Sequence, residues 1–293
     1  MKILAGRSNQ ILAKYLAVEL NIKSIEAQIT TFDDGEINIQ IFEDLHRLEV
    51  LIVQSTCQPV NDRLIELLLL IDATRRAGAS RIILIIPYFG YSRQDRQTYG
   101  SPVAARLIAS CLEHVGANHL ITIDLHSPQI AGFFNIPVQN LESFSLFAPT
   151  FENYSNFIIV SPDPGSTIRS QKVQKQFSSE IAIINKVRDS HNNCQSIEIL
   201  GNVKGKHCIL IDDIVDSGET ICNGARLLIN QGALSVDAFV THPVLSLNAA
   251  NYIQNSCISN IYVTDTIETS SLPDKFTVIP VAQVVLEALR KIL

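Results

Sequence analysis

The chain has 293 residues, of which 46% are hydrophobic and 18% are charged, and its formal net charge is −6. This composition excludes a disordered protein and is typical of a compact globular one, while a length of about 300 residues favours two domains over one. The acidic balance provides no electrostatic footprint for nucleic acid or for an anionic membrane, so we expect no partner of either kind.

Cysteine usage and hydropathy predict a cytoplasmic protein. The six cysteines show no Cys-x-x-Cys spacing, which favours reduced thiols. The most apolar segment, residues 64–73, is interrupted by Glu66 and Asp72 and is much shorter than the ~20 residues that span a bilayer. The first residues resemble a strand and a turn, and their apolar run is too short for a signal peptide.

Strand-like runs alternate with helix-like runs along the whole chain, which predicts an α/β protein with parallel sheets joined by helical crossovers. We expect strands at 50–53, 81–86, 120–124, 157–160, 181–185, 208–211, 236–240 and 261–263, and helices at 62–77, 102–114, 167–177 and 221–230. The two halves share this coarse plan without clear residue identity, so an internal duplication is only suggested.

The expected domain boundary lies within 141–149, where Asn, Ser, Phe and Pro cluster without a clear period. We therefore predict domains at 1–145 and 146–275, followed by a C-terminal helix at 276–293 that could pack back on the first domain. The expected helix 62–77 is apolar almost all around, which indicates burial in its own domain or a contact with another subunit. A homo-oligomer is thus expected.

Two segments of the first half look like parts of a nucleotide site: 32–41, and 87–96 directly after an expected strand. Phe32 could stack on a purine, and Arg93 could stack or pair with phosphate. Acids of the first segment could bind an exocyclic amine or order the loop. Taken singly, such residues are more often ordinary turns or surface ion pairs. The expected ATP-binding residues are Phe32, Asp34, Glu36, Arg93, Gln94 and Asp95.

The strongest functional signal lies in 208–220. Residues 208–211 form an apolar run typical of a central parallel strand, and Asp212 and Asp213 follow at its carboxyl end, where such sheets bind ligands. The two carboxylates could accept hydrogen bonds from vicinal sugar hydroxyls, directly or through a divalent cation. Helix N–H groups and hydroxyls beyond them could bind a phosphate. This expected phosphate loop comprises Asp216, Ser217, Gly218, Glu219 and Thr220.

In a simpler alternative, Asp216 only caps the helix and the acid pair only solvates a strand end. The segment, however, resembles the 5-phosphoribosyl-1-pyrophosphate (PRPP) binding motif of the type I phosphoribosyltransferase-like fold. That motif alone does not separate enzymes that consume PRPP from those that make it.

Several motifs occur in the order seen in ribose-phosphate diphosphokinases, also called PRPP synthetases, and the resemblance extends over about residues 5–267. They are FDDGE at 32–36, PYFGYSRQDR at 87–96, DLHSPQIAGFFNIPV at 124–138, IDDIVDSGET at 211–220 and THPVL at 241–245. The resemblance implies two tandem type I phosphoribosyltransferase-like domains. It also implies transfer of the β,γ-diphosphoryl group of ATP to ribose 5-phosphate, with Mg²⁺ as cofactor.

The resemblance assigns further residues. His126 and Asp163 match metal-binding positions, although a direct histidine contact to Mg²⁺ is chemically unusual. Lys186 and Arg188 match a catalytic pair that would clamp the transferring diphosphoryl group. Their simpler interpretation is a solvated basic turn. Asp212 and Asp213 would bind the ribose hydroxyls, and the loop at 216–220 the 5-phosphate.

The diphosphate loop, Asp163, Pro164, Gly165 and Ser166, departs from the usual Asp-Ala-Gly-Gly. Proline lacks an N–H group and serine resists a positive φ, so this loop must donate hydrogen bonds differently. Residues 46–50, Gly100 and the short C-terminus also depart from the family's phosphate and ADP regulatory site, which predicts weak regulation by either.

Two other functions remain open from the sequence. A catalytically silent homologue could regulate an active synthetase, and a phosphoribosyltransferase could consume PRPP. Retention of the expected site residues argues against the first, and the expected nucleotide segments argue against the second. The sequence does not decide between dimer, tetramer and hexamer, nor the choice of nucleotide donor.

Overall fold

The computed structural model describes residues 1–151, 154–188 and 194–293, and it leaves the side chains of 186–188 and 194–197 undescribed. The chain forms two compact α/β units. The first comprises 1–143 with 266–268 and 280–293, and the second comprises 144–265 with 269–279. The α/β class with mostly parallel sheets is thus confirmed.

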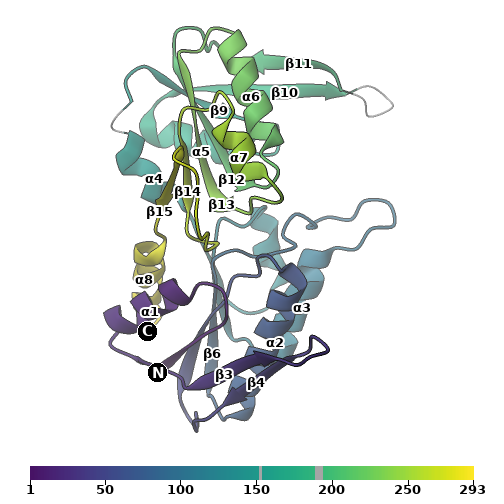
Figure 1. Cartoon of the computed structure of the whole chain (residues 1–293), viewed down its shortest axis with the longest axis vertical. Helices are drawn as coiled ribbons and strands as arrows, with labels where there is room; N and C mark the ends of the chain where they lie inside the picture. The colour runs from purple at the N-terminus through teal and green to yellow at the C-terminus, as the bar shows by residue number, and fades with distance from the viewer. Residues whose placement is uncertain (152–153, 189–193) are drawn as a thin grey trace. The chain divides into compact units, whose positions relative to one another are not determined.

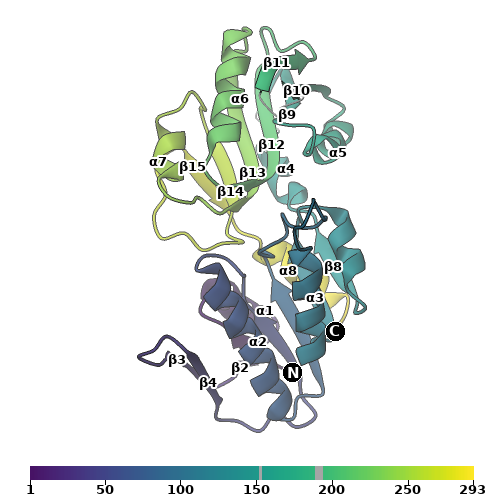
Figure 2. The same cartoon turned by 90° about the vertical axis from the view of Figure 1, so that its right-hand side faces the viewer.

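The first unit is built on a six-stranded parallel sheet in the order β2-β1-β5-β6-β7-β8, together with a two-stranded hairpin, β3-β4 (Figure 1). Its strands are β1 (Lys2–Ala5), β2 (Lys23–Ser24), β3 (Ala27–Thr31), β4 (Ile37–Ile41), β5 (Glu49–Val53), β6 (Arg81–Ile86), β7 (His119–Ile123) and β8 (Val138–Leu141). Its helices are α1 (Gln10–Glu19), α2 (Val60–Arg76), α3 (Ala104–Val115), the 3₁₀ helix η1 (Pro128–Phe133) and α8 (Ala282–Arg290). Helix α2 packs beside α3, and α1 beside α8 (Figure 2).

The second unit has a seven-stranded sheet in the order β11-β10-β9-β12-β13-β14-β15, parallel except for the β10–β11 pair. Its strands are β9 (Phe157–Ser161), β10 (Glu180–Arg188), β11 (Cys194–Leu200), β12 (His207–Val215), β13 (Ser235–Pro243), β14 (Ile261–Thr264) and β15 (Phe276–Ile279). Its helices are α4 (Phe144–Phe151), α5 (Thr167–Phe177), α6 (Glu219–Asn230) and α7 (Ala249–Gln254).

The two units share one strand topology. Counted along each unit, both sheets run second, first, third, fourth, fifth and sixth, once the β3-β4 hairpin and β11 are set aside. Connections of this kind between parallel strands place the carboxyl ends of neighbouring strands on one edge of each sheet. The duplication suggested by the sequence therefore has a topological counterpart.

Three features depart from the sequence expectations. Residues 276–279 form strand β15 rather than the start of a helix, because Phe, Thr, Val and Ile favour a strand and Pro280 then ends it. Residues 144–151, expected to lack a period, form helix α4, which buries Phe147 and Phe151 at i,i+4 spacing. Strand β12 runs to Val215 rather than ending at Ile211.

Candidate active site

Strand β12 holds the acid pair on a rigid support. It lies between β9 and β13 and pairs in parallel with both. Cys208 and Leu210 pack into one hydrophobic cluster, which includes residues of α6, while Ile209 and Ile211 pack into another, which includes Val173 of α5. Figure 2 shows these two helices on opposite sides of the sheet. The apolar run therefore reads as predicted, as a strand covered on both faces.

The acid pair lies within β12 rather than beyond its end, because Asp212 still pairs with Val240 of β13. One oxygen of Asp212, Oδ1, accepts a hydrogen bond from the Ser166 hydroxyl at 2.8 Å and another from the Asp213 N–H at 2.9 Å. Asp213 is 3% exposed, and its Oδ1 accepts a hydrogen bond from Arg169 Nη1 at 3.0 Å. Both carboxylates are thus held in a defined orientation.

Burial, together with the negative charges of Asp213 and Asp163, raises the pKa of Asp212 to about 8, while the Ser166 hydrogen bond and the Arg169 charge act in the opposite direction. Without a ligand Asp212 therefore favours its protonated form near neutral pH. A cation or a hydroxyl donor would favour the ionised form.

The predicted phosphate loop ends at the start of helix α6. Gly218 occupies the N-cap position at φ 79°, a left-handed conformation that suits glycine, and a Cβ there would lie 2.9 Å from Ile253 Cγ1. The helix starts at Glu219, two residues before the expected start, so Glu219 and Thr220 lie in its first turn. Asp216 lies two residues before the N-cap rather than at it, contrary to the alternative in which it caps the helix.

Hydrogen bonds to Asp163, the first residue of the diphosphate loop, hold this loop together. The Ser166 N–H donates to Asp163 Oδ1 at 2.9 Å, and the Ser161 hydroxyl donates to the Asp163 carbonyl at 2.7 Å. Ser166 has φ −85° and lies just before α5, so serine is unstrained there. The loop therefore does not use the positive φ that a glycine at this position would accept.

The predicted nucleotide residues all lie in the first unit, on two separate elements. Phe32 is 55% exposed at the tip of the β3-β4 hairpin, where the Glu36 N–H donates to Asp34 Oδ1 at 3.1 Å. Of the two roles predicted for Asp34, the structure shows the ordering of the loop. Arg93 and Gln94 are exposed in the loop after β6, and Asp95 is partly exposed. The Phe32 ring is therefore available for stacking.

The two predicted metal positions belong to different units: His126 follows β7 in the first, and Asp163 follows β9 in the second. Among the described residues, no group of three or more His, Cys, Asp or Glu side chains could hold a metal ion by itself.

Lys186 and Arg188 lie on β10, which pairs with β11. Their side chains lie outside the described part of the structure, so their predicted catalytic role stays a prediction.

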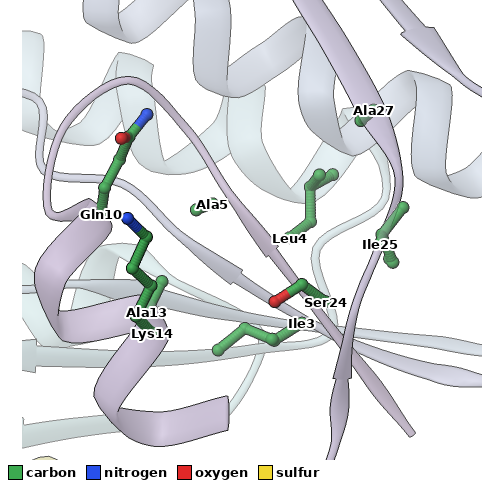
Figure 3. Close-up of a pocket in the computed structure, with 9 residues that line it drawn as sticks. All are labelled: Ile3, Leu4, Ala5, Gln10, Ala13, Lys14, Ser24, Ile25 and Ala27. Atoms are coloured by element: carbon green, nitrogen blue, oxygen red, sulfur yellow. The ribbon is translucent and has the colours of Figure 1, made fainter.

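A cavity of about 240 Å³ lies elsewhere in the first unit, between α1 and strands β1 to β3 (Figure 3). Its lining mixes aliphatic side chains with Gln10, Lys14 and Ser24 and includes none of the predicted site residues.

Along the described ranges 1–151, 154–188 and 194–293, no helix has the length and apolarity needed to cross a membrane.

Sequence reasoning missed Arg169 and the side-chain role of Ser166. Both lie at the start of α5 and bond to the acid pair 44 and 46 residues away. Their i,i+3 spacing could have indicated this role, because it places two polar side chains on one helix face just after a predicted ligand loop.

Comparisons with known proteins agree with this geometry. Residues 1–116 match the family model for the N-terminal domain of ribose phosphate pyrophosphokinase, and residues 189–293 match the phosphoribosyl synthetase-associated domain. Ribose-phosphate pyrophosphokinases of Thermosipho africanus and Thermotoga maritima are 41% and 40% identical over 100% of this chain, with 94% and 95% of their own lengths covered. The crystal structure of phosphoribosylpyrophosphate synthetase from Mycobacterium smegmatis superposes with a TM-score of 0.94 at 33% identity, covering 99% of this chain and 98% of that one.

Proposed function

Because the chain belongs to the ribose-phosphate pyrophosphokinase family, we infer that it transfers the β,γ-diphosphoryl group of ATP to the C1 hydroxyl of ribose 5-phosphate, which yields PRPP and AMP. The sugar hydroxyl attacks the β-phosphorus, and AMP leaves. Such a reaction depends on alignment of the two substrates and on neutralisation of phosphate charge more than on covalent chemistry by the protein.

The observation that carries this proposal is the acid pair of β12 followed by the α6 N-terminus. Asp212 Oδ2 has no hydrogen-bond donor among the described residues, so this oxygen can accept from a ribose hydroxyl. Ser217 and the first N–H groups of α6 supply donors for the 5-phosphate, and Gly218 allows a close approach of the backbone. These groups suit a pentose that carries one phosphate.

The carboxylates of the second unit fit a magnesium requirement. The mutual repulsion of Asp163, Asp212 and Asp213 raises the pKa of Asp212 beyond the effect of burial alone, and a divalent cation would relieve it. Asp163 and Asp212, together with water and substrate phosphate, would hold it, and the metal role predicted for His126 stays a prediction. When bound, Mg²⁺ would neutralise phosphate charge and orient the diphosphoryl group.

Donor binding and charge stabilisation are assigned to other residues. Phe32 would stack on the adenine, while Arg93, Gln94 and Asp95 would contact the nucleotide from the loop after β6. Lys186 and Arg188 would clamp the diphosphoryl oxygens as charge moves to the AMP leaving group. Asp163, Pro164, Gly165 and Ser166 would flank the diphosphate.

Incubation of the purified chain with ATP, Mg²⁺ and ribose 5-phosphate tests the proposal. We expect AMP to form only when both the metal and the sugar are present, and we expect Asp213→Asn to suppress it. A phosphoribosyltransferase would form no AMP and would consume PRPP with a base. A silent regulatory homologue would form no AMP and would alter the rate of an active synthetase.

A homo-oligomer and a reducing cellular compartment complete the proposal. Ile65 and Leu69 lie one turn apart on α2 and are 49% and 37% exposed, which supports a subunit contact on this helix. Each of the five described cysteines is a free thiol, which supports a cytoplasmic location. Light scattering of the purified chain measures the oligomeric state.

A further inference from the structure

Helix α5 begins with two donors that bond to the two acids of β12. Ser166 stands at the N-cap and Arg169 in the first turn, so they are three positions apart and their side chains share one face of the helix. The Ser166 hydroxyl donates to Asp212 Oδ1 at 2.8 Å, and Arg169 Nη1 donates to Asp213 Oδ1 at 3.0 Å. One helix turn thus fixes both carboxylates.

Each bond restrains an acid that would otherwise turn about its side-chain torsions. Ser166 is 5% exposed and Asp213 is 3% exposed, so both bonds are largely shielded from water, which would otherwise compete for them. Arg169 also supplies the positive charge that a buried aspartate needs. Backbone support comes from the Asp213 N–H, which donates to the same Asp212 oxygen as Ser166 does.

We propose that Ser166 and Arg169 are positioning residues: they orient the carboxylates of Asp212 and Asp213 toward a vicinal diol and thereby set the selectivity for a pentose 5-phosphate that carries both hydroxyls. This inference rests on the proposed function of the same site. A polar site built to receive a substrate hydroxyl rejects an analogue that lacks it, because its own groups then stay unpaired. That selectivity depends on carboxylates that cannot turn away.

The test compares ribose 5-phosphate with 2-deoxyribose 5-phosphate as acceptors for Ser166→Ala and for the original chain. We expect Ser166→Ala to raise the KM for ribose 5-phosphate about five- to tenfold and to lower the ratio of kcat/KM for the two sugars by about tenfold, since a hydrogen bond to a charged group is lost. The KM for ATP should change less than the KM for ribose 5-phosphate does, although Ser166 also belongs to the proposed diphosphate loop. Ser166→Thr, which keeps the hydroxyl, should restore the ratio.

Arg169→Lys retains the positive charge but loses the planar guanidinium, so it should lower the same ratio without the folding defect that Arg169→Ala risks. Ser170→Ala is a matched control on the same helix. Ser170 is buried, and its hydroxyl has no hydrogen-bond partner among the described residues. This control should leave the ratio unchanged.

The outcomes separate this inference from the proposed function. Absence of AMP formation by the original chain would refute the function itself. Normal turnover of the original chain, with an unchanged sugar ratio in Ser166→Ala and Arg169→Lys, would refute only the positioning role. An equal loss of selectivity in Ser170→Ala would also refute it, because the effect would then come from α5 as a whole.

Discussion

The polar residues at the carboxyl ends of the strands differ between the two sheets. In the first unit they bond to groups of the same unit, and in the second unit they include two neighbouring acids. In the first unit, Gln54, Ser55 and Thr56 follow β5, and all three are at most 2% exposed. Their side chains bond within the unit: the Ser55 hydroxyl donates to the Thr266 carbonyl at 2.6 Å, and Thr56 Oγ1 accepts from the Gly90 N–H at 2.6 Å. Groups of the first unit itself thus form hydrogen bonds with the polar side chains at this edge.

In the second unit, the corresponding central strand carries Asp212 and Asp213, and the loop beyond it has Ser217 exposed. One acid is paired with Arg169, and the other has a pKa raised by burial and by neighbouring charge. The same strand topology thus carries a stabilising polar network in the first unit and a candidate ligand site in the second. Where the polar groups satisfy one another, they stabilise the fold, and where they repel one another, they fit a ligand.

Replacement of Glu66 should produce the largest effect, and it should affect stability. This carboxylate is fully buried and accepts hydrogen bonds from Arg7 Nε at 2.6 Å and from Arg63 Nη1 and Gln54 Nε2 at 3.0 Å each. Glu66→Ala removes the centre of this network, so we expect a loss of about 3–5 kcal/mol in the free energy of unfolding. Urea denaturation followed by circular dichroism measures it.

The control for this prediction is Glu49→Ala in the same unit. Glu49 pairs with Arg81 at 3.3 Å, and both side chains are more than one-third exposed, so the loss should be below about 1 kcal/mol. Equal losses in the two variants would contradict the view that the first edge is a stabilising network.

Lys186→Ala in the second unit should lower turnover and leave stability unchanged, the converse of what we expect for Glu66→Ala. We expect kcat to fall about 10²- to 10³-fold, because the positive charge proposed to stabilise the transferring group is lost, while the unfolding free energy stays within about 0.5 kcal/mol. Lys175→Ala, an exposed lysine of α5, serves as the control and should leave both quantities unchanged. Near-normal turnover in Lys186→Ala would remove this residue from the catalytic machinery.

The sequence predicted the elements with strong periodicity or continuous apolar runs, such as β12 and α5. Residues whose role depends on distant partners were not predictable. Arg169 has an ordinary local pattern, and only folding brings it to Asp213. The same holds for Ser55, which reaches Thr266 across 211 residues. Helix α4 was missed because Pro149 inside it is typical of a loop.

Asp212→Asn should change stability in a pH-dependent way. The folded pKa of Asp212, about 8, lies above that of an unfolded aspartate, so ionisation opposes folding. The stability contributed by the protonated acid is fully present below the unfolded pKa and is lost as the pH rises through about 8. Asparagine does not ionise, so the variant should gain stability over the original chain by at most about 1.4 kcal/mol per pH unit between pH 4 and pH 8.

Thermal melts at pH 5, 7 and 9 measure that difference, which should widen with pH and level off above pH 8. The same variant should lose turnover with ribose 5-phosphate, because the acceptor proposed for its hydroxyls becomes a weaker one. Parallel stability profiles for the two proteins would show that Asp212 ionises in the fold without the predicted cost.

We expect the smallest effect for the loss of a single hydroxyl. The same replacement of serine by alanine, made after the corresponding strand of each unit, measures it. Ser217→Ala should raise the KM for ribose 5-phosphate about tenfold through loss of the proposed phosphate donor, because a hydrogen bond to a charged group contributes about 1.5 kcal/mol or more. Ser217 is exposed, and its sole hydrogen bond among the described residues is a long one of 3.4 Å from the Glu219 N–H, so the unfolding free energy should change by less than about 0.5 kcal/mol. Ser55→Ala should do the reverse: it removes the donor to Thr266 and the acceptor of the Tyr88 N–H, and so costs about 1–3 kcal/mol of stability with KM unchanged. An altered KM in Ser55→Ala together with an altered stability in Ser217→Ala would reverse the roles assigned to the two sheet edges.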